Sequence, residues 1–337
     1  MWRAIGKMVL RSCPEEEALR RIVMLFLLGP ALAFAQAYPS KPIRLFTLFA
    51  AGSTGDTTAR ALAGPLGDAL GQQVLVENLP GAGGVLAAER VARAAPDGYT
   101  LLYSLSSVHI MRVFLSRQTP FHPINDFTPI TQTGVTVTLL VGSPTLPAGS
   151  LRELLDYAKA NPGKVSYGTS GVGSPTHLTG ELIKQLENVD LVHVPYKAVS
   201  QAFLDVMGGQ IPLTFAISSQ VLPAVKSGKI KVLAVMEDGR YSVLPDVPSI
   251  SEVIPKFEPP PSWPGLFGPA GLPQPILRRI HADTVKVMNS PEMKAKLAAR
   301  DFQVITQKSP EEFMAKIQRE LALVGGIVKR AGIQPSD

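Results

Sequence analysis

Two short turns rich in glycine, serine and threonine carry the residues with the clearest chemistry in this sequence. The first, residues 50–55, follows an apolar run that predicts a strand and precedes a stretch with helical spacing of apolar residues. The second, residues 168–176, lies in the same setting, between a predicted strand and a predicted helix. The first turn of a helix has backbone N–H groups without a partner and carries partial positive charge. Each turn is therefore expected to hold a carboxylate or phosphate without lysine or arginine.

Three features beside these turns allow two interpretations each. Asp56 would lie in the first turn of its helix, where a carboxylate either caps local N–H groups or contacts a ligand, and capping is favoured. His177 begins the second helix and is interpreted as a structural residue that orients the turn before it. Residues 80–84 follow a strand and open a further helix, so their backbone either lines the same site or forms a tight turn.

Other chemistries find little support in the sequence. The five histidines form no i, i+4 pair and no HExxH motif, and the single cysteine is Cys13, so no metal site is expected. Residues 52–55 lack the lysine of a P-loop, residues 80–84 lack a dinucleotide-binding fingerprint, and no GxSxG motif surrounds Ser170 or Ser174. We expect no cofactor and no catalysis, with a periplasmic enzyme as an alternative. The basic residues behind the net charge of +6 are scattered, which argues against nucleic-acid binding.

The first 37 residues have the features of a secretory leader. A basic pair at 20–21, an apolar run of about a dozen residues and two small-x-small sites predict a signal peptide removed near Ala35 or Ala37. The run is shorter than the roughly twenty residues that a membrane-spanning helix needs, so an N-terminal anchor is the less favoured alternative. The leader is long, and translation starting at Met8 is also compatible with it. The mature chain is expected in the periplasm.

The rest of the chain predicts an α/β protein of two domains. Its 337 residues, 45% hydrophobic and 18% charged, are enough for two cores. Strands alternate with helices, which favours mainly parallel sheets with helices on both faces. Proline-rich stretches mark two crossovers, so we expect a first lobe at 38–139 plus 263–337, a second at 140–262 and a ligand cleft between them. The predicted strands are 43–49, 74–77, 100–103, 137–142, 165–167, 191–194, 212–216 and 231–235, and the predicted helices 57–70, 84–95, 150–160, 177–186, 199–207, 219–227, 275–288, 291–299 and 310–331.

Eight strings along the chain resemble the landmarks of the Bug family, the extracytoplasmic receptors of tripartite tricarboxylate transporters. They are YPSKPIRL (38–45), FAAGSTGD (49–56), VENLPGAGG (76–84), APDGYTLL (95–102), YGTSGVGSPTHL (167–178), HVPYK (193–197), LPDVPSISE (244–252) and SWPGLFGPAGLP (262–273). They occur in the family's order and cover essentially the whole mature chain. The resemblance implies a two-lobed periplasmic-binding-protein fold that closes on a small organic carboxylate. The expected partners are that ligand and the membrane subunits of a transporter, and the expected state is a monomer. Presentation of the ligand to a membrane sensor is an alternative use of the same fold.

The resemblance also implies which residues bind the ligand, through backbone N–H groups, hydroxyls and bridging water. The sequence departs from the family at Ala198, where members commonly have glycine, and at Ala216, where members often have aspartate. Without that aspartate a ligand ammonium loses an acceptor, so a plain carboxylate is favoured over an amino acid. The expected ligand-binding residues are Phe49, Ala50, Gly52, Ser53, Thr54 and Asp56 in the first lobe, and Ser170, Gly173, Ser174, Thr176, His177, Ala198 and Ala216 in the second.

Overall fold

The computed structural model describes residues 38–237, 239–241 and 243–335. The predicted signal peptide, its cleavage sites at Ala35 and Ala37 and the start at Met8 lie outside the described residues. Residues 38–40 belong to a separate unit of the chain, and the account below concerns the unit Lys41–Asp337 by itself. In the described part of this unit, no helix combines the length and the apolar character needed to cross a bilayer.

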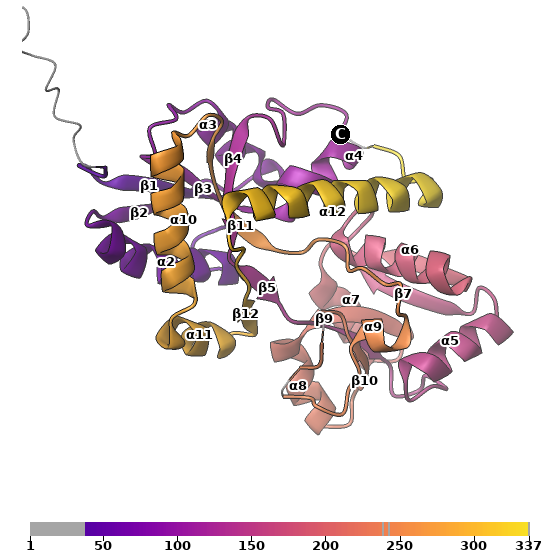
Figure 1. Ribbon diagram of the computed structural model, residues 1–337. Coiled ribbons are helices and arrows are strands. Elements are labelled where there is room, and N and C mark those ends of the chain that lie inside the picture. The colour runs from indigo at the N-terminus through magenta and orange to yellow at the C-terminus, as the bar shows by residue number, and fades with distance from the viewer. Residues whose placement is uncertain (1–37, 238, 242, 336–337) are drawn as a thin grey trace, which may run out of the picture. The chain divides into compact units, whose positions relative to one another are not determined.

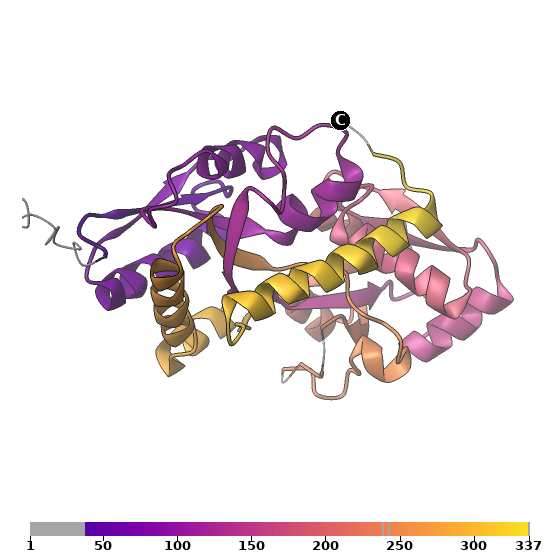
Figure 2. The same ribbon diagram turned by 45° about the horizontal axis from the view of Figure 1, so that its top comes forward.

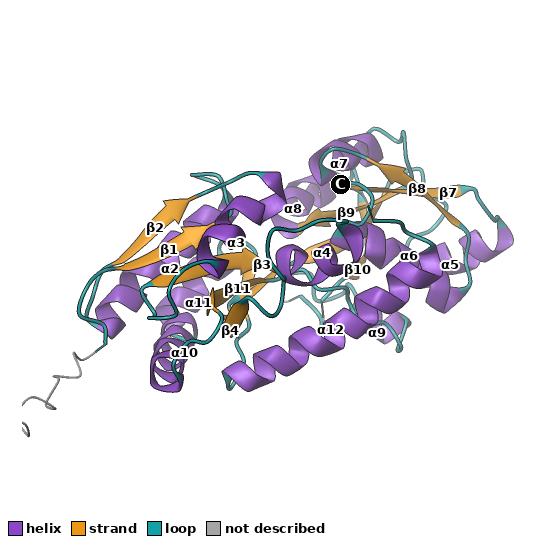
Figure 3. Ribbon diagram, turned by 90° about the horizontal axis from the view of Figure 1, so that it is seen from above, coloured by secondary structure: helices purple, strands orange, loops and turns teal. Residues whose placement is uncertain are grey.

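Two five-stranded sheets form the centre of this unit, and helices flank both of them (Figures 1 and 3). The first sheet has the order β2-β1-β3-β11-β4, with β1 (Ile43–Thr47), β2 (Val74–Asn78), β3 (Thr100–Leu105), β4 (Phe127–Gln132) and β11 (Pro264–Pro269). The second has the order β10-β6-β9-β7-β8, with β6 (Thr138–Gly142), β7 (Val165–Thr169), β8 (Leu191–Pro195), β9 (Leu213–Ile217) and β10 (Lys231–Val235). A small ribbon pairs β5 (Gly134–Thr136) with β12 (Phe302–Val304).

Both sheets are mixed: in each of them four strands run in one direction and one strand runs in the opposite direction. Strands β2, β1 and β3 are parallel, but β11 runs antiparallel to β3 and β4. Likewise β7 is parallel to β8 and β9, whereas β6 runs antiparallel to β9 and β10. The reversed strands, β6 and β11, are the first strands of their five-stranded sheets after each crossover. After each crossover, the chain reaches the new sheet at the edge where the other strands have their carboxyl ends. The first strand after the crossover therefore runs in the opposite direction to the other strands of that sheet.

The helices fall close to the predicted stretches because their ends are encoded locally. Serine side chains cap the N-termini of helices such as α5 and α12, where the Oγ atoms of Ser150 and Ser309 accept hydrogen bonds from backbone N–H groups three residues later. The helices are α2 (Thr54–Leu70), α3 (Val85–Ala92), α4 (Arg112–Leu115), α5 (Leu151–Ala160), α6 (Pro175–Glu187), α7 (Val199–Met207), α8 (Ser218–Lys226), α9 (Ile250–Val253), α10 (Gln274–Met288), α11 (Pro291–Ala298) and α12 (Pro310–Ala331).

Helix α12 packs against the first sheet and against a helix that flanks the second sheet. It contacts β4 of the first sheet and helix α6, which follows β7 of the second (Figure 2). Phe313 of α12 packs edge-on against the indole ring of Trp263, with the ring centroids 5.1 Å apart. Near its other end, the backbone carbonyl of Ile327 accepts a hydrogen bond from Gln185 of α6, and Arg330 donates one to the same glutamine. Any relative motion of the two sheets must therefore rearrange contacts of α12.

Candidate functional site

The turn after β1 is held in shape by Asp56, whose side chain is 3% exposed. Its carboxylate accepts hydrogen bonds from the backbone N–H of Gly52 at 2.8 Å and from the amide of Asn78 at 2.7 Å, and it pairs with Arg60. Burial raises the pKa of Asp56, but these hydrogen bonds outweigh burial and hold the pKa below its ordinary value. The geometry fits the capping role that the sequence favours, and a direct ligand contact of Asp56 stays a prediction.

The rest of this turn combines a serine cap with an aromatic side chain. Ser53 is the N-cap of α2, and its Oγ accepts a hydrogen bond from the N–H of Asp56 at 3.4 Å. The ring of Phe49 lies directly over Gly55, where a Cβ atom would overlap it, and the ring centroid is 6.1 Å from that of Tyr103. Because Gly55 has no side chain, the ring of Phe49 can occupy this position against the start of α2. The exposed residues of the turn are Ala50, Ala51, Gly52 and Thr54.

The turn after β7 is built around Ser174 and His177. Ser174 is the N-cap of α6: its Oγ accepts from the N–H of His177 at 3.3 Å and donates to the carbonyl of Gly171 at 2.7 Å. The hydroxyl of Thr176 lies 3.1 Å from the same Oγ atom. The Nδ1 atom of His177 accepts a hydrogen bond from the N–H of Gly173 at 3.0 Å. His177 therefore orients the turn before it, as the sequence predicts.

A second histidine, which the sequence analysis missed, supports this turn. His193 stacks on His177 with ring centroids 3.9 Å apart, and its Nε2 lies 2.6 Å from the hydroxyl of Thr169. Thr169 in turn accepts a hydrogen bond from the N–H of Gly171. Burial lowers the pKa of both imidazoles, and the neighbouring ring helps to lower that of His193 to about 4. Both rings are thus neutral near pH 7. The HVPYK string was the available signal for His193, but it gave no role.

Residues 107–115, which follow β3, lie next to residues near the first turn at one end and next to the second turn at the other. A Cβ atom at Gly84 would lie 2.8 Å from Val108 and 3.2 Å from Leu48, next to the first turn. At the other end of this segment, a Cβ atom at Gly173 would lie 2.6 Å from Leu115. The tertiary structure thus connects both neighbourhoods through a segment that the sequence did not single out.

The remaining expected residues lie in different environments. Ser170 is exposed at the end of β7, and Ala198 is half-buried in extended backbone at the start of α7. Ala216 is 1% exposed and belongs to an apolar cluster with Phe203 of α7 and Val221 of α8. Its methyl group therefore packs against helices that cover the second sheet. Ligand contacts of Ser170, Ala198 and Ala216 stay predictions.

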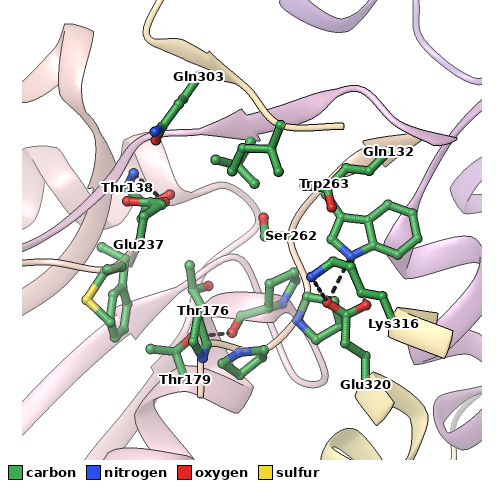
Figure 4. Close-up of a pocket in the computed structure, with 18 of the residues that line it drawn as sticks. Gln132, Thr138, Thr176, Thr179, Glu237, Ser262, Trp263, Gln303, Lys316 and Glu320 are labelled. Atoms are coloured by element: carbon green, nitrogen blue, oxygen red, sulfur yellow. Dashed lines mark hydrogen bonds and ion pairs between the residues drawn. The ribbon is translucent and has the colours of Figure 1, made fainter. Parts of the chain in front are cut away.

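A cavity of about 250 Å³, called the junction cavity below, lies where the chain passes between the two sheets (Figure 4). Among the expected ligand-binding residues, Thr176 lines it. Its most polar wall joins three side chains: Lys316 Nζ lies 2.7 Å from Glu320 Oε1, and the indole N–H of Trp263 donates to the same carboxylate at 2.9 Å. The sequence analysis missed this cavity because its walls come from separate segments, namely residues 132–138, 175–179, 215, 236–237, 259–263, 303–307 and 316–320.

The chain forms two mixed sheets flanked by helices and joined by two crossovers. In each sheet, a serine-capped helix begins beyond the end of one strand. This is the architecture of a two-lobed solute-binding protein. In the described part of the chain, no group of three or more His, Cys, Asp or Glu side chains is arranged to hold a metal ion. This chain belongs to the TctC family, described as the tripartite tricarboxylate transporter family receptor, which it matches over residues 58–333.

Similarity to individual proteins, in sequence and in structure, supports the assignment to this family. Protein BugT of Bordetella pertussis is 31% identical over 300 residues, which cover 88% of this chain and 91% of BugT. The structure of Rpa4515 of R. palustris with adipate has 30% identity and a TM-score of 0.72, and the match covers 89% of this chain and 100% of that chain. The structure of MatC (Rpa3494) from Rhodopseudomonas palustris with bound malate has 30% identity and a TM-score of 0.67, and the match covers 86% of this chain and 100% of that chain. The resemblance to Bug receptors and the periplasmic-binding-protein fold are confirmed.

Proposed function

We propose that this chain is a periplasmic receptor that captures a small organic carboxylate between two lobes and delivers it to the membrane subunits of a tripartite tricarboxylate-type transporter. The lobes are residues 38–139 plus 263–337 and residues 140–262. The observation that carries the proposal is the pair of serine-capped helix N-termini, at Ser53 and Ser174, each beyond the end of a strand in a different sheet. The receptor acts without catalysis and as a monomer, after removal of the signal peptide near Ala35 or Ala37.

The chemistry of the two turns supports a carboxylate as the ligand. Residues 49–56 and 170–177 contain no lysine and no arginine, but they offer backbone N–H groups at helix N-termini together with the hydroxyls of Ser53, Thr54, Ser170 and Thr176. Such groups hold a negative charge at the end of a helix. Asp56 and His177 keep the turns in shape through Gly52 and Gly173. The adipate and malate bound to the two R. palustris proteins support a small dicarboxylate for this chain as well.

Calorimetry and thermal unfolding of the mature chain with a panel of organic acids, including adipate, malate, succinate and citrate, test this function. A ligand at a hundredfold excess over its dissociation constant should add about 2.7 kcal/mol to the free energy of unfolding. Recovery of the acid unchanged after incubation checks the absence of catalysis. Co-purification of the transporter's membrane subunits with the ligand-bound form checks delivery. A panel in which no carboxylate binds would contradict the proposal.

A further inference from the structure

Tyr103 connects the surroundings of the first turn to the first crossover, which is the segment between β4 and β6. It belongs to β3, which lies between β1, the strand before the first turn, and β11, the strand after the second crossover (Figure 3). Its side chain is fully buried. Its ring centroid lies 6.1 Å from that of Phe49, and its hydroxyl lies 3.0 Å from the Oγ1 atom of Thr133. A single side chain therefore contacts the residue that borders the first turn and the residue with which the first crossover begins.

Thr133 in turn holds the two crossovers together. Its hydroxyl and its backbone N–H both donate to the carbonyl of Pro264, at 3.2 and 3.0 Å. Pro264 is the first residue of β11 and directly follows the second crossover, which runs from β10 to β11. The carbonyl of Thr133 accepts a hydrogen bond from the N–H of Ile305, which follows β12. Thr133 therefore cannot shift without changing its contacts with both of these segments.

The direction of these hydrogen bonds is set by the number of protons. The Thr133 hydroxyl has one proton, which it donates to Pro264, so the Tyr103 hydroxyl is the donor to Thr133 Oγ1. Burial raises the pKa of Tyr103, so this hydroxyl keeps its proton at neutral pH. Neither side chain is exposed to water, and a buried donor without an acceptor is costly. The ring of Tyr103 is therefore kept at a fixed position relative to Thr133.

Phe49 forms the end of this connection at the proposed carboxylate site. Its ring lies against Gly55 in the first turn of α2, where an added Cβ atom would overlap it. The distance of 6.1 Å between the ring centroids of Phe49 and Tyr103 is typical of packed aromatic pairs. A ligand that fixes the first turn therefore also fixes the ring against which Tyr103 packs. The contacts run from Phe49 through Tyr103 to Thr133, and so from the first turn to both crossovers.

We propose that Tyr103 is a positioning residue that couples occupancy of the first turn to bending of the two crossovers, and so to closure of the lobes. This coupling rests on the proposed function, since it concerns how the carboxylate receptor closes. Tyr103 acts without touching the ligand, through Phe49 on one side and Thr133 on the other. Coupling between binding and closure is reciprocal. A weaker connection therefore lowers the affinity for the ligand as well as the extent of closure.

Tyr103→Phe tests the connection, because it removes the hydroxyl and keeps the ring beside Phe49. Calorimetry with whichever acid binds the wild-type chain should show an affinity weakened about fivefold or more, since the ring is no longer tied to Thr133. Thr133→Val removes the acceptor and should weaken binding by a similar factor. An affinity of Tyr103→Phe equal to that of the wild-type chain would overturn the proposal.

Thr128→Val is the matched control, at the other end of β4. The Thr128 hydroxyl donates to the carbonyl of Pro269 of β11 at 2.9 Å and accepts a hydrogen bond from the N–H of Leu272. It thus makes the same kinds of bond as the Thr133 hydroxyl. Strand β4 runs in the same direction as β1, so Thr128 lies at the opposite edge of the sheet from the first turn. Thr128→Val should lower stability but keep the affinity, and equal losses of affinity in both threonine variants would contradict the coupling.

The double variant Tyr103→Phe/Thr133→Val tests whether the two residues act as a pair. If Tyr103 acts through Thr133, the double variant should lose no more affinity than the weaker-binding single variant. Losses that multiply would show that the two hydroxyls act independently, and this would refute the route through Thr133.

A spectroscopic readout separates coupling from stability. Trp263 directly precedes Pro264 and is the only tryptophan after Trp2. Its fluorescence should change when the acid closes the wild-type lobes, and the change at saturating ligand should be smaller in Tyr103→Phe. A purely structural role of Tyr103 would lower the stability of the variant and leave the fluorescence change at its wild-type size, which would count against the proposal.

The coupling and the receptor function fail in different ways. A wild-type chain that binds no carboxylate would refute the receptor function and, with it, the coupling. A wild-type chain that binds and closes, beside a Tyr103→Phe chain that does so equally well, would refute the coupling alone.

Discussion

The Nδ1 atom of His177 accepts a hydrogen bond from the backbone N–H of Gly173 at 3.0 Å, and this bond requires an imidazole that is unprotonated at Nδ1. The imidazole of His193 stacks on that of His177, with the ring centroids 3.9 Å apart. Protonation of either ring would place positive charge in a partly desolvated stack, and protonation of His177 at Nδ1 would remove the acceptor for Gly173. The shape of the second turn is therefore linked to the neutral state of two histidines.

Stability should fall as the pH drops below the ordinary histidine range. The folded-state pKa of His193 is about 4 and that of His177 is lowered, while the ordinary value is 6.5, so the unfolded chain binds more protons between these values. The contribution of the neutral rings is complete above about pH 6.5 and is lost as the pH falls towards about 4. Urea unfolding across this range measures it. A free energy of unfolding that stays constant from neutral pH down to about 5 would contradict this linkage.

Replacing Ser174 by alanine should weaken carboxylate binding by about 1–2 kcal/mol, because the Ser174 hydroxyl holds the second turn in shape through hydrogen bonds with Gly171 and His177. The same change removes the N-cap of α6 and should lower stability by about 0.5–2 kcal/mol. Ser290→Ala separates these effects, because Ser290 caps α11 in the same way, with its Oγ accepting from Met293 N–H at 3.2 Å. That control should lose stability but keep its affinity, measured by calorimetry. Equal affinities of the two variants would argue that the second turn does not bind the ligand.

Gly55→Ala should weaken carboxylate binding by displacing the ring of Phe49 from the first turn. A Cβ atom at residue 55 would overlap that ring, so either the ring or the start of α2 must move. Gly64→Ala is the matched control in the same helix, since no atom lies within 4 Å of its added Cβ. It should raise stability by about 0.5–1 kcal/mol and leave affinity unchanged. Titration of both variants with adipate compares them, and full affinity in Gly55→Ala would remove Phe49 from the site.

The two proposed lobes should close around the carboxylate, because each supplies half of its partners. Small-angle scattering should give a smaller radius of gyration with ligand than without it. Closure must also rearrange the contacts of α12 with α6, including the hydrogen bond from Arg330 to Gln185. Identical scattering curves at saturating ligand would rule out a clamshell motion.

At the carboxylate site, succinate should bind more tightly than aspartate, by about tenfold or more. The resemblance to the Bug family implies an aspartate at the position of Ala216, and in this structure Ala216 packs in an apolar cluster with Phe203 and Val221. A ligand ammonium buried near it would lack an acceptor, and an uncompensated buried charge costs several kcal/mol. Calorimetry with this pair, which differs by the amino group, measures the difference. Tighter binding of aspartate would show that another carboxylate accepts the ammonium.

The sequence by itself determined the two turns and most of the secondary structure, because these depend on residues close together in the chain. The strand predicted at 43–49 is Ile43–Thr47, and the helix predicted at 177–186 is Pro175–Glu187. The caps at Ser53 and Ser174 join residues three positions apart, and His177 bonds to Gly173 four positions before it. Contacts this short depend on local geometry, which side-chain type and spacing encode.

Only the tertiary structure decided the direction of β6 and β11, the stacking of His193 on His177, the burial of Ala216 and the existence of the junction cavity. Glu237 and Lys316 both line the cavity. In its polar wall, Trp263 donates a hydrogen bond to Glu320, which lies 57 positions further along the chain. No local pattern of residue types specifies such a pair. Its members meet because two crossovers and α12 carry distant segments to one place, and the path of the chain is fixed by packing of the whole unit.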